Sequence, residues 1–345
     1  MTSGGEDRAR ERENDATLKT CLRLPSPPGA AAHRTGMQFA GAPSTGAPST
    51  ATGAGQTADH ADLAMLQSNT RAMAASLQRA CGKLVVRLQA DEHGKTRLCD
   101  LFQQGCLSAR LPRSQRLGEV DVIMMNTAGG LTGGDRLSVD VSVGEGAHAA
   151  LTTPACERLY RSIGGEVTID QRLAVGCRAR LDWIPQETIL YDGGRVRRRL
   201  DVELADGAEI TIAESLLLGR AAMGESVERG SYQDFWTLRR AGRLCFADAV
   251  RIAAPIDRLA ACPTVLGGRT ALASIVHVGS DLTDKRDALR AAFAAIEPLW
   301  AGASVVGDVL VARMVAQDGR LLRRALLAAL TCVRRERGLP RSFLC

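Results

Sequence analysis

A period of two in the placement of apolar residues constrains this chain more than any other feature. Leu137, Val139 and Val141 alternate with serine and aspartate, and a glycine-rich turn at 144–146 follows them. Successive side chains of a β-strand lie on opposite faces, so this pattern is typical of a strand with one buried face. The pattern recurs at 165–175, 178–184 and 197–214. Many short strands with a turn signal about every ten residues predict a mainly β fold of stacked sheets or β-helical type, and not βαβ units.

The remaining patterns predict one hairpin and two late helices. Asp206-Gly207 stands between two alternating runs, which predicts a hairpin turn. At 281–300 and 318–338 the apolar residues return at helical spacing, and Gly338 and Pro340 mark the end of the second segment. We therefore expect a few C-terminal α-helices that pack on the sheets or on a partner.

The N-terminal part of the chain has a different composition. Residues 1–58 are rich in Gly, Ala, Ser, Thr and Pro and contain the near-repeat GAPSTGAPST. Such a segment cannot bury enough apolar surface to offset the entropy of ordering. We predict a disordered extension at 1–58, a linker or marginal helix at 59–75 and a folded domain at 76–345.

The net charge of +6 is carried mainly by arginine, with basic runs at 195–199 and 334–337. Aromatic residues make up only 3% of the chain. Binders of single-stranded nucleic acid interleave their cations with aromatic stacking platforms, so this composition disfavours nucleic acid as a partner. The arginines indicate either a solvated face or an acidic protein partner.

The ten cysteines are scattered along the chain and form no CxxC pair. The N-terminal segment is charged and has no apolar region like that of a secretory leader. No segment offers the ~18 uninterrupted apolar residues that a membrane span needs. We therefore expect a cytoplasmic protein with reduced thiols and no membrane partner.

A glycine-rich loop precedes the first alternating run. Gly129 and Gly134 have the spacing of a phosphate-binding loop, but Asp135 and Arg136 replace its lysine and its hydroxyl residue. A carboxylate at that position would repel phosphate, and the flanking segments are strand-like rather than helical. The loop is therefore predicted to be a tight bend between strands, with Asp135 placed for a cation, a partner's arginine or an ordered water.

Several carboxylates border the glycine loop or apolar strand segments. They are Asp135, Glu187, Asp192 and Glu214. No histidine or cysteine spacing typical of a permanent metal site accompanies them. Burying a carboxylate is costly unless it is paired or reaches water. Two interpretations stay open: ion pairs with the many arginines, or a polar path whose oxygens hold a divalent cation weakly.

A carboxylate-using hydrolase is the enzymatic alternative, with Glu187 and Asp192 or Glu214 as acid and base. A glycosidase pair needs its carboxyls roughly 5 to 9.5 Å apart across a cleft, usually with aromatic platforms for the sugar. The chain has only three Trp and three Tyr, which counts against this alternative.

Five segments, in this order and spacing, resemble the urease accessory protein D family, called H in some organisms. They are NTAGGLTGGDRL at 126–137, LTTPACERLYRS at 151–162, WIPQETILYDGGR at 183–195, ESLLLGRAAMGE at 214–225 and the closing segment at 321–343. The resemblance covers 76–345 and implies a β-helical stack of sheets. It also implies a non-enzymatic scaffold that binds the urease apoprotein on one side and the accessory proteins F (UreF) and G (UreG) on the other. In that assembly the GTPase G carries nickel, and no cofactor is bound permanently.

The resemblance further implies a water-filled passage through which nickel travels transiently. The family motifs place Asp135, Glu187, Asp192 and Glu214 along it. Scattered oxygen ligands suit such a path because they release nickel more readily than clustered thiolates do. The chain departs from many relatives at NTAGGLTGG, where a proline-containing variant is usual, and we expect this difference to change only the geometry of the turn.

Overall fold

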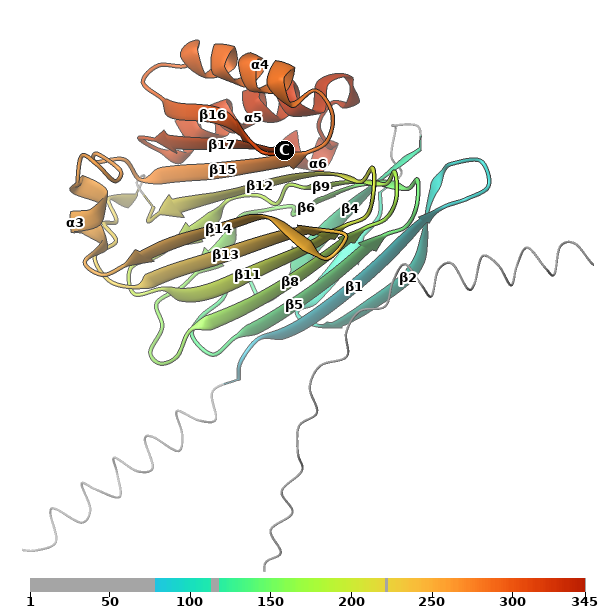
Figure 1. Cartoon of the computed structure of the whole chain (residues 1–345). Coiled ribbons are helices and arrows are strands. Elements are labelled where there is room, and N and C mark those ends of the chain that lie inside the picture. The colour runs from blue at the N-terminus through green and yellow to red at the C-terminus, as the bar shows by residue number, and fades with distance from the viewer. Residues whose placement is uncertain (1–77, 113–117, 221–222, 345) are drawn as a thin grey trace, which may run out of the picture. The chain divides into compact units, whose positions relative to one another are not determined.

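The computed structural model describes residues 78–112, 118–220 and 223–344. The described residues belong to one compact unit. Most of them lie in strands, and the longer helices follow at the C-terminal end (Figure 1). This confirms the predicted mainly β fold. The predicted extension at 1–58 and the predicted linker or marginal helix at 59–75 lie outside the described residues.

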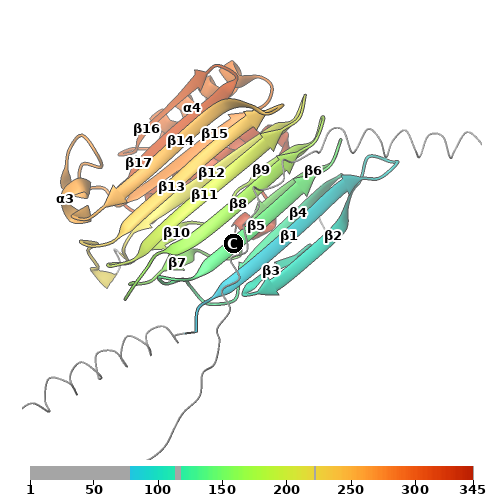
Figure 2. The ribbon, with the colours of Figure 1, turned by 60° about the horizontal axis from the view of Figure 1, so that its bottom comes forward.

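Two sheets pack face to face. The seven-stranded sheet has the order β14-β13-β11-β8-β5-β1-β2. Its strands are β1 (Cys81–Ala90), β2 (Thr96–Gly105), β5 (Arg136–Val143), β8 (Val167–Val175), β11 (Arg195–Leu204), β13 (Ser231–Arg240) and β14 (Arg243–Ala253). Figure 2 looks toward its outer face.

The ten-stranded sheet has the order β16-β17-β15-β12-β9-β6-β4-β3, and the short strands β7 and β10 pair beside β12. Its strands are β3 (Leu107–Arg110), β4 (Glu119–Asn126), β6 (His148–Thr152), β7 (Glu157–Leu159), β9 (Arg180–Trp183), β10 (Thr188–Leu190), β12 (Glu209–Leu218), β15 (Ala271–Val278), β16 (Trp300–Val306) and β17 (Val309–Ala316).

The chain winds between the two sheets as a coil. After β4 in the ten-stranded sheet it crosses to β5 in the seven-stranded sheet, returns to β6, and repeats this circuit as far as β13. Each strand therefore pairs in parallel with the strand one turn earlier, as in β5, β8, β11 and β13. The strands β4, β6, β9 and β12 do the same in the other sheet. This is the stacked, β-helical arrangement that the strand pattern predicts.

The predicted hairpin at Asp206-Gly207 is wrong. Gly207 does turn the chain, with a φ of +68°. However, β11 before it pairs with β8 and β13, whereas β12 after it pairs with β9, β10 and β15. The turn therefore carries the chain from one sheet to the other. Alternation determines which face of a strand is buried, but it does not determine which strand lies beside it.

A shorter ladder of leucines joins the turns of the coil. Leu159 pairs with Leu190, Leu190 pairs with Leu218, and Leu131 forms a bridge to Leu159. All four are buried, and we call them the leucine column. Each lies where the chain leaves the ten-stranded sheet for the seven-stranded one. Successive turns are thus packed on one another by a side chain of the same kind.

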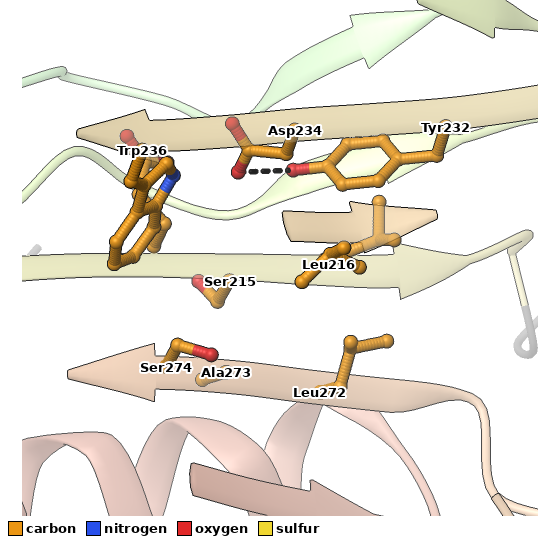
Figure 3. Close-up of a pocket in the computed structure, with 10 residues that line it drawn as sticks. Ser215, Leu216, Tyr232, Asp234, Trp236, Leu272, Ala273 and Ser274 are labelled. Carbon is orange, nitrogen blue, oxygen red and sulfur yellow. Dashed lines mark hydrogen bonds between the residues drawn. The ribbon is translucent and has the colours of Figure 1, made fainter. Parts of the chain in front are cut away.

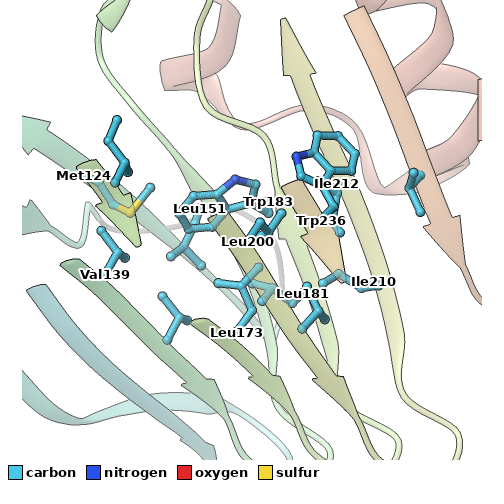
Figure 4. Close-up of a cluster of buried hydrophobic side chains, with 14 of the residues drawn as sticks. Met124, Val139, Leu151, Leu173, Leu181, Trp183, Leu200, Ile210, Ile212 and Trp236 are labelled. Carbon is cyan, nitrogen blue, oxygen red and sulfur yellow. The ribbon is translucent and has the colours of Figure 1, made fainter. Parts of the chain in front are cut away.

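The main core fills the space between the sheets (Figure 4). Trp183 and Ile212 enter it from the ten-stranded sheet, and Leu173, Leu200 and Trp236 enter it from the other. Few aromatics are available, so leucine, valine and isoleucine supply most of the apolar area that stabilises the fold.

A second core lies on the outer side of the ten-stranded sheet, under the C-terminal helices. The helices are α3 (Ile256–Ala261), α4 (Leu282–Ala294), α5 (Gly319–Arg334), the 3₁₀ turn η2 (Arg335–Arg337) and α6 (Arg341–Leu344). The two late helices are confirmed, but the first is shorter than the predicted 281–300. It ends at Ala294, and Trp300 begins β16. Pro298 cannot continue a helix, which accounts for the early end. None of the helices in the described part of the chain is long and apolar enough to cross a membrane.

The leucine column leads to a test of stability. We expect Leu190→Ala to lower the free energy of unfolding by about 2–5 kcal/mol, because it opens a cavity between stacked turns. Ile189→Ala is the matched control, since Ile189 is only partly buried on the other face of β10. Urea denaturation followed by circular dichroism measures both. Equal losses in the two variants would contradict the role given to the column.

Candidate functional site

The glycine-rich loop carries the chain from β4 in one sheet to β5 in the other. At Gly130, where φ is +138°, an added Cβ would lie 2.4 Å from the Tyr160 ring. At Gly133 it would lie 1.9 Å from the Ser162 hydroxyl oxygen. Glycine is therefore required because the next turn of the coil lies directly against the loop. The predicted tight bend between strands is confirmed.

Asp135 holds this bend in place. The residue is 3% exposed. Its Oδ1 accepts a hydrogen bond from the backbone N–H of Ala80 at 2.8 Å, and its Oδ2 accepts one from the N–H of Thr132 at 2.7 Å. Hydrogen bonds to an ionised acceptor are stronger than neutral ones. The structure thus places the carboxylate where it joins the loop to the residue that precedes β1.

Asp192 binds a crossing loop in a similar way two turns further along the coil. Its Oδ1 accepts from the backbone N–H groups of Glu228 and Arg229, and its Oδ2 pairs with Arg161 at 2.9 Å and with Arg229 at 2.7 Å. Burial opposes ionisation, but the hydrogen bonds and charge of Arg229 prevail and lower the pKa of Asp192 to about 2. Asp192 is therefore ionised and fully engaged at neutral pH.

Glu187 faces the C-terminal helices rather than the space between the sheets. Its Oε1 lies 3.4 Å from Nη1 of Arg323 in α5, and its Oε2 accepts from the thiol of Cys156 at 3.5 Å. The same guanidinium binds the side chain of Gln186 and stacks 4.2 Å from the Phe343 ring centre. Burial, together with the charge of Glu187, raises the pKa of Cys156 to about 11, so this thiol is protonated.

Glu214 belongs to a buried group of charges between the sheets. It accepts a hydrogen bond from the indole N–H of Trp183 at 2.8 Å and pairs with Arg198 at 2.6 Å. Arg198 crosses the core from β11 and also binds Asp234 at 2.5 Å and the Tyr232 hydroxyl at 2.6 Å. We call Trp183, Arg198, Glu214, Tyr232 and Asp234 the interior charge cluster. It links the two sheets through their apolar core.

The interior charge cluster has two carboxylates facing one guanidinium. Burial raises the pKa of Glu214 above its ordinary value, and the charge of Asp234 adds to the effect, although Arg198 opposes it. Burial likewise raises the pKa of Tyr232. Two acids therefore share a single cation in the interior charge cluster.

A small cavity adjoins this cluster (Figure 3). Its volume is about 20 Å³, and Glu214, Tyr232, Asp234 and Ser274 are among the residues that line it. This is room for about one water molecule, and the lining offers enough polar partners to hold it. The interior therefore combines carboxylate oxygens with a space of solvent size.

A second buried network of charges joins α5 to the ten-stranded sheet. Arg334 is 1% exposed and pairs with Asp182 and, at 3.1 Å, with Glu119 of the ten-stranded sheet. Arg337 also reaches Asp182, at 2.8 Å. Burial opposes it, but the charges of Arg334 and Arg337 hold the pKa of Asp182 below its usual range. The expectation of a solvated face at 334–337 is wrong for Arg334, because the helix turns this side chain toward the sheet.

The four carboxylates singled out in the sequence have separate partners and do not form one site. Asp135 and Asp192 fasten turns of the coil, Glu187 faces α5, and Glu214 lies in the core. Over the described ranges, no group of three or more His, Cys, Asp or Glu residues is arranged to hold a metal ion. The interpretation as ion pairs with arginine holds for Glu187, Asp192 and Glu214.

Arg198 and Asp234 are the residues that the sequence interpretation missed. A signal was present, because Arg198 stands at the position of β11 that the apolar Val196 and Leu200 assign to the buried face. A charged residue in the buried phase of a strand needs a partner inside the fold.

The described fold coincides with a known protein family. Residues 78–343 match the family described as "UreD urease accessory protein". A protein of Methylobacterium sp. (strain 4-46) named "Urease accessory protein UreD" is 42% identical over 267 residues, which are 76% of this chain and 93% of that protein. Proteins of the same name from Rhizobium etli and Xanthobacter autotrophicus are 40% and 41% identical, over 72% and 82% of this chain and 89% and 95% of their own lengths.

The interior charge cluster leads to a prediction about stability. We expect Arg198→Met to lower the free energy of unfolding by about 3–5 kcal/mol, because it leaves two carboxylates buried without a cation. Arg197→Met is the matched control: this arginine is next in sequence, but its side chain is 52% exposed, and we expect a change of at most about 1 kcal/mol.

Glu214→Gln completes a double-mutant cycle with Arg198→Met. The double variant should lose less stability than the sum of the two single losses, since the glutamine leaves one buried charge fewer. Urea midpoints of the four proteins measure the cycle. Strict additivity would show that Arg198 and Glu214 do not interact.

Proposed function

Because this chain belongs to the UreD urease accessory protein family, we propose that it is a non-enzymatic scaffold of urease maturation. In this proposal it binds the urease apoprotein and the accessory proteins UreF and UreG, and the assembly inserts nickel into the urease active site at the expense of GTP. The observation that carries the proposal is the family match, which spans almost the whole described fold. The compared relatives are named accessory proteins, in keeping with a non-catalytic role.

The arrangement of the carboxylates supports a scaffold better than a hydrolase. An acid and base pair needs two carboxyls that face one substrate. Glu187, Asp192 and Glu214 each bind a different arginine. The cavity between the sheets is lined by Glu214 without Glu187 or Asp192. The pair on which the hydrolase alternative depends is therefore not assembled.

We propose nickel as the cargo of a path through the core, with Glu214 as its main oxygen ligand. Support comes from the acidic excess of the interior charge cluster and from the cavity of about 20 Å³ beside it. Asp135 and Asp192 suit the path less well, because they lie at the crossing loops and do not line this cavity. Glu187 retains a weak contact with Arg323 and suits an exit toward the helices. Oxygen ligands of this kind would release the ion readily.

Deleting the gene tests the proposed function. We expect the deletion strain to produce urease subunits in normal amounts with little nickel and little activity, because the scaffold is absent. Metal analysis of the purified urease measures this, and a plasmid copy of the gene should restore both values. Fully nickel-loaded, active urease from the deletion strain would refute the proposed function.

A single substitution tests the nickel path. We expect Glu214→Gln to lower urease activation at limiting nickel by roughly tenfold while the complex still forms, because the amide loses the negative charge that attracts the cation. Glu209→Gln, at the far end of the same strand, is the control, since Glu209 pairs with Arg180 away from the cavity. Activation by Glu214→Gln equal to that by the wild type would remove Glu214 from the path and leave the scaffold role intact.

A further inference from the structure

One end of the outer face of the seven-stranded sheet carries an excess of exposed cations. We call this set the basic face: Lys83, Arg136, Arg195, Arg197, Arg199 and Arg251. The strand register brings Arg136, Arg197 and Arg251 into a single row across the sheet. Lys83 and Arg199 belong to the next row. The cations therefore gather in space although they come from four different strands.

These cations are poorly neutralised within the chain. Arg197 pairs with Glu166 at 3.2 Å, and Asp170 lies in the row of Arg199. Within the described part of the chain, the other members of the basic face have no ion pair. Lys83 and Arg251 instead lie over the rings of Phe102 and Phe235. Like charges gathered on one sheet face destabilise the isolated fold, so the folded chain gains nothing from this arrangement.

The other end of the same face differs in charge. There Arg87, Arg172 and Arg239 stand among Asp140, Asp201 and Glu203 in the corresponding rows. Arg87 pairs with Asp100, and Arg172 lies 3.8 Å from Asp140. A face that only keeps the protein in solution would need no more than this mixed pattern. The excess of positive charge at the other end, the basic face, therefore needs a separate explanation.

The basic face is open and ends in a hollow. The C-terminal helices pack on the other sheet, and Figure 2 shows no helix across the row from β1 to β14. Parallel sheets are usually covered on both faces, so an open one is a surface available to a partner. Where β11 begins, a hollow of about 700 Å³ is lined by Arg195, Arg229 and Glu166. Asp192 holds Arg229 in position there.

We propose that the basic face binds an acidic surface of another protein, one of whose carboxylates enters the hollow beside Arg195. Charge complementarity identifies this partner. Arginine favours protein interfaces because its planar guanidinium binds carboxylates through two hydrogen bonds. A nucleic acid fits less well, because Glu166 and Asp170 interrupt the positive charge and Phe102 and Phe235 lie beneath Lys83 and Arg251 rather than forming free stacking platforms. The proposal rests on the proposed function only in expecting this partner within the urease maturation complex.

A charge-reversal pair tests the proposal. Arg195→Glu with Arg199→Glu changes two exposed side chains that form no ion pair with the described residues, so the fold should be unaffected. Arg87→Glu with Arg172→Glu is the matched control, with the same change of charge at the balanced end of the face. The full chain is produced together with the urease subunits, UreF and UreG, and its binding to each is measured at two salt concentrations.

We expect the Arg195/Arg199 pair to weaken binding to one of these proteins about tenfold at low salt, and the difference to shrink at about 0.5 M salt. The control pair should bind like the wild type. The Arg195/Arg199 pair should also bind poly-L-glutamate more weakly than the control pair and the wild type do. This measurement uses the purified chain alone, so it tests the basic face even if the proposed function is wrong. Failure of the wild type to activate urease would refute the proposed function alone.

Three results would overturn the proposal. The first is equal binding and equal urease activation by the two variant pairs. The second is a loss of binding that does not depend on salt. The third is a different occupant, shown either by tighter binding of a 20-base-pair DNA duplex than of the proteins or by a change only in self-association during sedimentation.

Discussion

The fold depends on the crossing that the chain makes between two sheets at every turn of the coil. A crossing loop must reverse direction while it packs on the loops of neighbouring turns, so its backbone polar groups have few water partners. The glycines of the first loop allow the close approach, and Asp135 and Asp192 supply acceptors for the N–H groups that the loops leave unpaired. The leucine column then packs these crossings on one another.

Buried charges join layers that otherwise meet through apolar contacts. Arg198 connects the two sheets, and Arg334 connects the last long helix to the ten-stranded sheet. Replacing such pairs by apolar residues can be neutral for stability, whereas removing one partner is costly. We interpret these pairs as fixing the alignment of the layers, because each guanidinium binds carboxylates from two other elements.

The sequence was sufficient for the alternating strands at 137–143, 165–175, 178–184 and 197–214 and for the late helices, because period-two and helical patterns report local geometry. The sequence was insufficient to predict which strands pair with one another in the sheets. Asp206-Gly207 has the composition of a hairpin turn, yet it connects strands of different sheets, since alternation is the same in both arrangements. Trp300 fits a helical face but begins a strand beyond Pro298. The sequence shows that Arg198 and Arg334 are positively charged, but it does not show which carboxylates they bind. Those carboxylates come from distant segments that only the fold brings together.

The sequence motifs of this family report the geometry of the fold more than they report the function. Leu131, Leu159, Leu190 and Leu218 each lie in one of the segments that carry the family resemblance, and together they form one column. Much of what makes these motifs recognisable is therefore the geometry of the crossings, which the coil requires whatever the protein binds. A catalytic cleft with the acid and base expected from the sequence would show those carboxylates converging on a shared space, whereas Glu187, Asp192 and Glu214 bind separate arginines. A maturation role must then be carried by surfaces and by the few polar groups in the core, where Glu214 meets the cavity.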